Sequence, residues 1–205
     1  FPGDSLNRIH WTLTARWQKL MVKEFEIDPS HNVWIILDLE GSVHRGHGQE
    51  STEECSVGIA ASLVKHFLDR GYAIGLVGYG EPTISLSPDH GSRQLMRALD
   101  SLAGVHSTGK VSMVEAINRM ERNLGRKELA VLITPSPKED WVGAAQLLAR
   151  RGVRLMAVLL DPSTFAGGDN SLLVFSSLVA SRIPTFLVKN GDPLDQALSQ
   201  VNLVY

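Results

Sequence analysis

Residues 33–42 read VWIILDLEGS, and the predicted fold rests on this segment. Its first five residues form a continuous apolar run rich in β-branched side chains, which is typical of a strand buried on both faces of a parallel sheet. Asp38 follows the run directly, and Gly41 and Ser42 end the apolar pattern. We therefore expect a central strand over residues 33–37 that carries a polar loop at its carboxyl end.

Further apolar runs alternate with amphipathic stretches along the chain. The gap between residues 79 and 83 is too short for a crossover helix, so the two strands beside it must run antiparallel. The order of elements predicts an α/β fold: a doubly wound, mostly parallel six-stranded sheet with helices on both faces and an antiparallel edge strand at residues 83–86. The expected strands are residues 33–37, 73–79, 83–86, 129–133, 153–160 and 184–188, and the expected helices are 53–70, 93–102, 111–124, 139–151, 171–181 and a last one capped by Asp192.

This topology also predicts where a ligand or partner would bind. Right-handed crossovers place residues 33–37 in the centre of the sheet, beside residues 129–133, and the winding reverses between these two strands. Open α/β sheets bind ligands at such a switch point, beyond the carboxyl ends of the strands. The loops that begin at Asp38 and Thr134 should therefore line one crevice.

Length and composition exclude several classes of protein. The chain has 205 residues, 43% of them hydrophobic and 20% charged, which fits one folded domain with or without a short appendage. Twenty basic and 22 acidic residues give a net charge of −2, so we expect no nucleic-acid partner. No apolar run approaches the roughly 18–20 residues that span a bilayer, so we expect no membrane contact within this sequence. Because it begins at Phe1 without a methionine, we interpret it as a piece of a longer protein.

The first 32 residues differ from the rest and carry a recognisable signature. It comprises Pro2-Gly3-Asp4, Arg8-Ile9-His10-Trp11, Ala15-Arg16 and the run LMVKEFE at residues 20–26, which includes Glu24 and Glu26. This pattern resembles the domain-of-unknown-function 58 family, in which it leads into a von Willebrand factor A-like, Rossmann-like domain. We therefore divide the chain into a signature arm (1–32) and a von Willebrand factor A-like domain (33–205). Asn7 departs from the arginine that is common in the family.

The resemblance implies several properties of the whole protein. It implies a bacterial or archaeal protein with this domain in the cytoplasm, often anchored to the inner membrane by two upstream helices. A MoxR-type AAA+ ATPase is the partner that it suggests, and it brings no established catalytic activity. Within the arm, we expect Trp11 to be buried against the domain and Arg8 or Arg16 to pair with a carboxylate.

Von Willebrand A-like domains often hold Mg²⁺ or Ca²⁺ at the switch point, in a metal-ion-dependent adhesion site (MIDAS). The family pattern is D-x-S-x-S after the first strand, a threonine from a later loop and an aspartate after the fourth strand. Here Asp38 and Ser42 match the pattern, and Glu40 replaces a serine. Thr108 is a plausible threonine, and the residue after the fourth strand is Thr134 and not the aspartate of the pattern. The resemblance therefore implies a degenerate MIDAS.

Charge and size decide what we expect of this site. Asp38 and Glu40 restore two carboxylates, as a hard cation requires, but the longer Glu40 intrudes on the space of the metal. Without a cation the pair needs hydrogen bonds or a positive neighbour, for which Lys110 is the candidate. We expect no cofactor and no resident metal. If Mg²⁺ or Ca²⁺ did bind, its ligands would be Asp38, Glu40, Ser42 and Thr108.

Other motifs carry less weight. Residues 104–110, GVHSTGK, match a P-loop except that Val111 stands at the eighth position and a helix precedes the motif. His44, His47 and Cys55 do not make a convincing zinc site, and we expect the two histidines to be solvated in a polar loop. No G-x-S-x-G elbow is present. Asp161 is predicted to form a turn.

Two function classes remain. The first is a non-catalytic module that binds a protein through the crevice residues Asp38, Glu40, Ser42, Thr108, Lys110 and Thr134, or through the arm. The alternative is a divalent-metal-dependent ligand-binding domain or a small-molecule enzyme that uses the Asp38/Glu40 crevice. Since an acid–base–nucleophile set is missing from the motifs, the sequence favours the interaction module.

Overall fold

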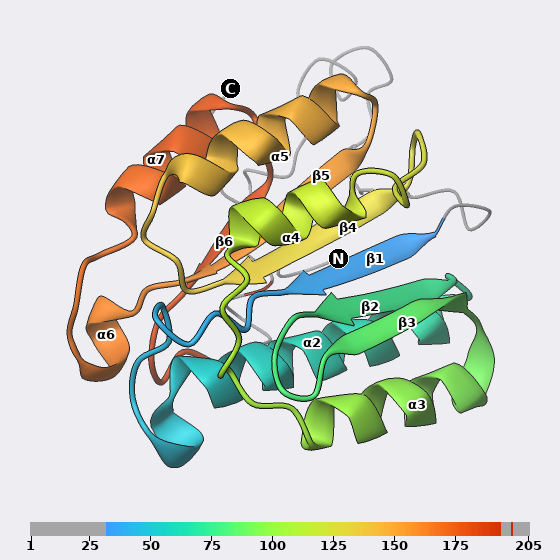
Figure 1. Ribbon diagram of the computed structural model, residues 1–205, viewed down its shortest axis with the longest axis horizontal. Helices are drawn as coiled ribbons and strands as arrows, with labels where there is room; N and C mark the ends of the chain where they lie inside the picture. Colours follow the sequence, from blue (N-terminus) through green and yellow to red (C-terminus); the bar gives the residue numbers. More distant parts are fainter. Residues whose placement is uncertain (1–31, 194–197, 199–205) are drawn as a thin grey trace, which may run out of the picture.

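The computed structural model describes residues 32–193 and 198, which form a six-stranded sheet between two layers of helices (Figure 1). The strands are β1 (Val33–Leu37), β2 (Ile74–Gly78), β3 (Ile84–Asp89), β4 (Leu129–Thr134), β5 (Arg154–Leu160) and β6 (Thr185–Val188). The helices are α2 (Thr52–Asp69), α3 (Gly91–Ala103), α4 (Met113–Met120), α5 (Asp140–Arg150), α6 (Ser163–Ala166) and α7 (Leu172–Ala180), with a 3₁₀ turn, η2 (Gly48–Glu50).

The sheet order is β3-β2-β1-β4-β5-β6, and every pair is parallel except β2 with β3. This confirms the predicted fold class, the central place of β1 beside β4 and the antiparallel edge at β3. All five residues of β1 are buried, as its unbroken apolar run requires.

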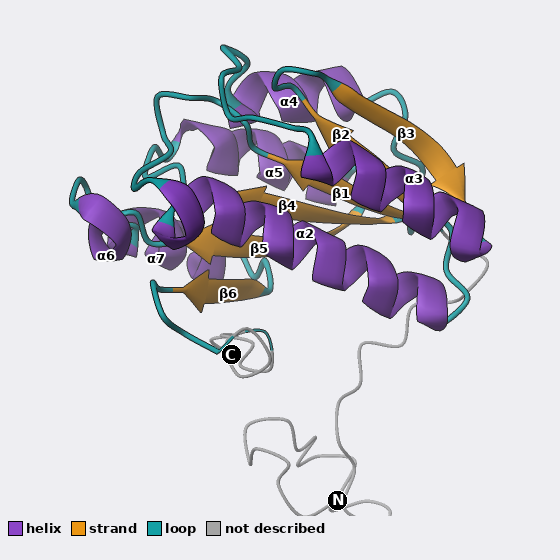
Figure 2. Cartoon of the chain, turned by 90° about the horizontal axis from the view of Figure 1, so that it is seen from below, coloured by secondary structure: helices purple, strands orange, loops and turns teal. Residues whose placement is uncertain are grey.

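The two faces of the sheet have separate cores. Val33, Ile35 and Leu37 pack on the side that α2 and α3 cover, which faces the viewer in Figure 2. Trp34 and Ile36 point to the opposite side, against α4, α5 and α7. Successive residues of a strand alternate between faces, so this one pentapeptide contributes to both cores.

Trp34 lies over a glycine of the neighbouring strand. Its register partner in β2 is Gly75, and a β-carbon built on Gly75 would lie 2.9 Å from Cδ2 of the indole. On its other side, Trp34 Nε1 donates a hydrogen bond of 3.1 Å to Glu128 just before β4. Because Gly75 has no side chain, the indole fits between the sheet and the helices that cover this face.

Some boundaries differ from the predicted ones. β3 extends to Asp89, because an edge strand can include polar residues and Pro88, which the apolar pattern does not reveal. α4 ends at Met120 and the chain then turns, although the buried Leu124 continues the apolar spacing. The short elements η2 and α6 were not among the predicted ones.

Several expectations concern residues outside the described part of the chain. The signature residues Pro2, Gly3, Asp4, Arg8, Trp11, Arg16, Glu24 and Glu26 all lie there, and so do the expected contacts of Trp11, Arg8 and Arg16. The helix expected after Asp192 also lies outside the described residues. Asp192 itself accepts a hydrogen bond of 2.9 Å from the backbone N–H of Lys189.

Candidate functional site

The carboxyl ends of the two central strands meet at a buried pair, Asp38 and Thr134. Asp38 is 2% exposed and Thr134 is fully buried. The Thr134 hydroxyl donates to Asp38 Oδ2 at 2.6 Å, and the backbone N–H of Glu40 donates to Asp38 Oδ1 at 3.0 Å. Both carboxylate oxygens therefore have donors from the chain itself.

Burial dominates the protonation of Asp38. Desolvation raises the pKa of this carboxyl from 3.8 to about 6, although the hydrogen bonds from Thr134 and Glu40 oppose the rise. The nearby charge of Glu40 raises the pKa further, and that of Lys138 lowers it. A carboxyl with this pKa changes charge near neutral pH.

Glu40 forms an ion pair with Lys138, which was not among the predicted site residues. Lys138 Nζ, from the loop after β4, lies 3.1 Å from Glu40 Oε1, and the Ser42 hydroxyl also donates to that oxygen. The expectation for Lys110 was wrong in this respect, since Lys110 is exposed and Lys138 supplies the cation. Lys138 is half exposed, so its ammonium group also faces solvent.

The loop that contains Thr108 lies against the loop after β1 through its backbone. Gly109 donates to the Leu39 carbonyl at 3.0 Å, and Gly41 donates to the Gly109 carbonyl at 3.0 Å. A β-carbon on Gly109 would lie 2.9 Å from the Leu39 oxygen and far inside contact distance of the Tyr79 carbonyl oxygen. The Thr108 side chain is exposed, so this loop reaches the crevice mainly through its main chain.

His44 is partly buried and connects the loop after β1 to the start of α2. The prediction that it is a solvated loop residue was therefore wrong. Its Nε2 is 3.0 Å from the Asp38 carbonyl oxygen, and its Nδ1 is 3.1 Å from the Thr52 hydroxyl at the start of α2. Burial lowers the pKa of His44, so the ring is held neutral. The sequence shows only a polar, glycine-containing loop here, and the burial arises when α2 packs on that loop.

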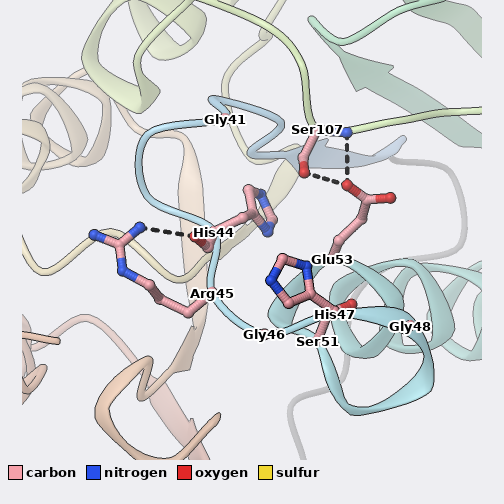
Figure 3. A pocket seen from close by; sticks show the side chains of 9 residues that line it. All are labelled: Gly41, His44, Arg45, Gly46, His47, Gly48, Ser51, Glu53 and Ser107. Carbon is pink, nitrogen blue, oxygen red and sulfur yellow. Dashed lines mark hydrogen bonds between the residues drawn. The ribbon is translucent and has the colours of Figure 1, made fainter. Parts of the chain in front are cut away.

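A shallow pocket of about 290 Å³ opens beside the crevice (Figure 3). Its lining residues are Gly41, His44, Arg45, Gly46, His47, Gly48, Ser51, Glu53 and Ser107. Glu53 accepts a hydrogen bond of 2.8 Å from the Ser107 N–H and another from the Ser107 hydroxyl. Partial burial opposes ionisation, but these hydrogen bonds prevail and lower the pKa of Glu53. Cys55, on α2, is half-buried, and burial raises the pKa of its thiol to about 11.

His44 is expected to stabilise the crevice measurably. His44→Ala removes the donor to a carbonyl that burial keeps from water, so we expect a loss of about 1–3 kcal/mol in the free energy of unfolding. Urea denaturation followed by circular dichroism measures it. His47→Ala is the matched control, because His47 lines the same pocket but is exposed, and it should change stability by less than about 0.5 kcal/mol. Equal effects of the two substitutions would contradict the supporting role of His44.

The sheet order, the antiparallel edge and the polar crevice at the switch point define a von Willebrand factor A-like domain. Solved structures share this fold: BatB from Bacteroides thetaiotaomicron has a TM-score of 0.59 at 18% identity and covers 83% of this chain and 96% of that chain. The SpRpn10 VWA domain has a TM-score of 0.54 at 10% identity over 82% of this chain and 93% of that chain. Proximal thread matrix protein 1 from the mussel byssus has a TM-score of 0.57 at 12% identity and covers 85% of this chain and 47% of that chain.

The family model described as "Protein of unknown function DUF58" matches residues 1–165, so the chain belongs to this family. The uncharacterized protein Rv1480 of Mycobacterium tuberculosis is 23% identical over 168 residues, which are 78% of this chain and 52% of that protein. The uncharacterized protein YeaD of Bacillus subtilis is 27% identical over 161 residues, covering 76% and 37% respectively. The chain thus spans about half, or less, of the length of these relatives. Within the described residues, no helix is long and apolar enough to cross a membrane.

Proposed function

We propose that this chain is a non-catalytic protein-interaction module whose carboxyl-edge crevice is a degenerate MIDAS that works without a metal. The observation that carries the proposal is the ion pair between Glu40 and Lys138, 3.1 Å apart at the switch point. A lysine ammonium there supplies the positive charge that a divalent cation supplies in a complete MIDAS.

The donor set around the crevice supports this proposal. Mg²⁺ needs six oxygen ligands in near-octahedral geometry, and Ca²⁺ needs six to eight. Both oxygens of Asp38 already accept hydrogen bonds, and Glu40 Oε1 is engaged by Lys138 and Ser42. Across residues 32–193 and 198, no group of three or more His, Cys, Asp or Glu side chains is placed to hold a metal ion. The residues present therefore fit an internal cation better than a bound one.

Lys138 gives the crevice a way to recognise a partner. Because its ammonium is half exposed while Glu40 is mostly covered, a partner's carboxylate can approach Lys138 from solvent without displacing the internal pair. In a complete MIDAS, the metal ion binds a partner's carboxylate that approaches from solvent in the same way. We therefore assign Lys138 as the central contact of the interface, with the Thr108 loop and the neighbouring pocket at its rim.

The partner that we propose is a MoxR-type AAA+ ATPase, in a membrane-associated complex anchored by segments upstream of this domain. Support comes from membership of the DUF58 family and from the von Willebrand A-like fold, since domains of this fold generally mediate protein interactions.

The partner proposal is tested with the full-length protein and a MoxR-type ATPase from the same cell. Lys138→Glu should weaken their binding at least about tenfold in calorimetric or surface-binding measurements, because it places a carboxylate beside Glu40 and repels an acidic partner group. Lys65→Glu is the matched control, since Lys65 is also exposed and ion-paired but lies on α2, and it should leave the affinity unchanged. Equal affinity of all three proteins would contradict the proposed interface.

Metal titration gives a separate prediction. Mg²⁺, Ca²⁺ and Mn²⁺ at millimolar concentration should leave the melting temperature unchanged and release no binding heat, because a cation would have to displace Lys138 and the donors to Asp38. Asp38→Ala serves as the control. Micromolar binding that disappears in this variant would overturn the metal-free site.

That outcome would favour the second candidate, a divalent-metal-dependent ligand-binding domain or a small-molecule enzyme. Two observations keep it in view. Asp38 and Glu40 are neighbouring carboxylates, and Asp38 has a raised pKa, as many functional carboxyls do. A further structure of proximal thread matrix protein 1, with a TM-score of 0.52, is described as having a zinc-occupied MIDAS motif.

A further inference from the structure

A basic surface lies at the opposite end of the sheet, where β1, β4, β5 and β6 begin. Its residues come from the loop after α4, the end of α5 with the residue that follows it, and the second residue after α7, and all are exposed. We call it the amino-edge basic surface: Arg122, Arg126, Lys127, Arg150, Arg151 and Arg182. In Figure 1 the loop after α4 and the loop after α5 lie together at the end where β1 begins.

Contacts between the loops join these residues into one surface. Lys127 donates through its backbone N–H to the Gly152 carbonyl at 2.8 Å, and Arg126 Nε donates to the Arg151 carbonyl at 3.3 Å. The end of α7 is tied to α5 by a hydrogen bond of 2.6 Å from Gln146 Nε2 to the Ser181 hydroxyl.

The carboxylates near this surface are already engaged. Glu121 pairs with Arg151. Glu128 accepts hydrogen bonds from Asn32 Nδ2 at 2.6 Å, from Trp34 Nε1 at 3.1 Å and from the Gly125 N–H at 2.8 Å. The other five basic side chains of the surface have no carboxylate partner among the residues that the structure describes. Positive charge is therefore left over in a protein whose net charge is −2.

Two of these basic residues occupy backbone positions that favour glycine. Lys127 has φ 68° and Arg182 has φ 57°, and they are the two non-glycine residues with positive φ in the described part of the chain. Arg182 is the second residue after α7, and Gly71 and Gly152 take the same place after α2 and α5, with φ 82° and 91°. A lysine or arginine at a backbone position with positive φ, which glycine adopts at lower cost, indicates that its side chain has a function.

The chain itself enters the fold beside this surface. The Asn32 carbonyl accepts a hydrogen bond of 3.1 Å from the Leu129 N–H, and its side chain contacts Glu128, the neighbour of Lys127. Residues 24–28, just upstream, lie outside the described part of the chain, and their sequence EFEID carries three carboxylates and no basic residue. At about 3.3 Å per extended residue, Asp28 can reach about 13 Å from Asn32 and Glu24 about 26 Å.

We propose that residues 24–28 bind the amino-edge basic surface, with Glu24, Glu26 and Asp28 paired to arginines around Arg126 and Lys127. Arginine suits this role because its planar group holds a carboxylate by two parallel hydrogen bonds. A tether of four residues gives an effective concentration in the millimolar range, so weak ion pairs suffice. The docked segment fixes the upstream part of the protein at the amino edge and leaves the carboxyl-edge crevice open to a partner. The proposal is independent of the partner assignment made above.

Cysteine cross-linking in the full chain tests this proposal. In a Cys55→Ser background, Glu26→Cys is paired with Arg126→Cys, and the rate of disulfide formation is measured at low salt. The matched control pairs Glu26→Cys with Asp69→Cys, an exposed residue at the end of α2 on the same edge of the sheet. We expect the first pair to close at least about tenfold faster than the control pair, and to slow to the control rate in 1 M NaCl.

Charge reversal adds a second arm. Arg122→Glu with Arg150→Glu should slow the closure several-fold, and adding Glu24→Lys and Asp28→Lys should restore it, since the charges are then exchanged. Equal closure rates for the two cysteine pairs, or a fast rate that neither salt nor charge reversal changes, would overturn the proposal. The salt measurement needs no charge-reversed variant, so it remains decisive even if a reversal unfolds the domain.

Discussion

Gly109→Ala should destabilise the domain by about 3 kcal/mol or more, the largest effect that we expect from a single methyl group in this protein. The added carbon would collide with the carbonyl oxygens of Tyr79 and Leu39, and both belong to backbone that cannot rotate away. The loop would have to move, which breaks the Gly109–Leu39 and Gly41–Gly109 hydrogen bonds of 3.0 Å. Chemical denaturation measures the loss, and amide exchange at Gly41 and Gly109 locates it.

A second glycine provides the control for this substitution. Gly143 lies in α5 with no atom near the position of an added β-carbon, so Gly143→Ala should stabilise the protein by about 0.5–1 kcal/mol through helix propensity. If both substitutions change stability by less than 1 kcal/mol, the close approach of the two loops is not required for the fold.

Asp38→Asn should gain stability relative to the parent protein as the pH rises. The pKa of Asp38 is about 6 in the fold against an ordinary value of 3.8, so between these values the folded protein keeps a proton that the unfolded chain releases. The parent therefore loses stability as the pH rises through this window, by roughly 3 kcal/mol in total, and loses no more above it. The asparagine variant has no such proton, so its advantage should grow from about pH 3 to about pH 7 and then remain constant.

The difference between the two proteins isolates Asp38 from an opposing group. His44 has a lowered pKa, so it reduces stability as the pH falls below about 6.5, but it does so in both proteins. Urea denaturation at several pH values gives the difference. Asp169→Asn, an exposed loop substitution, should show no pH-dependent difference. A constant gap between Asp38→Asn and the parent would mean that burial does not raise the pKa of Asp38.

The strand order could be predicted from sequence because each strand is a short apolar run and the crossover rule leaves few arrangements. β1 illustrates this, because its unbroken apolar run together with the crossover rule placed it beside β4 in the centre of the sheet, with Asp38 at its carboxyl end. The ends of helices and strands were less predictable where a residue is buried but lies outside the element that its spacing predicts. Leu124 is buried at helical spacing although the chain there has already left α4.

The candidate site could be predicted only in part, because side chains from distant segments complete it. Asp38 and Thr134 follow from the topology, whereas Lys138 pairs with a residue 98 positions away. A signal did exist, since Lys138 lies in the loop that follows Thr134 and is a cation near the missing aspartate. His44 offered no comparable signal, because its burial depends on Thr52 and the start of α2.

Trp34 and Gly75 have a consequence for how the chain reaches its fold. β1 and β2 are both buried along their whole length, so a shift of two residues in their register would keep every side chain on its own face of the sheet. The burial of apolar side chains alone would therefore not disfavour the shifted register. Such a slip would bring Trp34 opposite Ala73 or Val77, whose side chains fill the space that Gly75 leaves open. It would also move the indole away from Glu128. The indole of Trp34 and the missing side chain of Gly75 therefore select one register of β1 against β2.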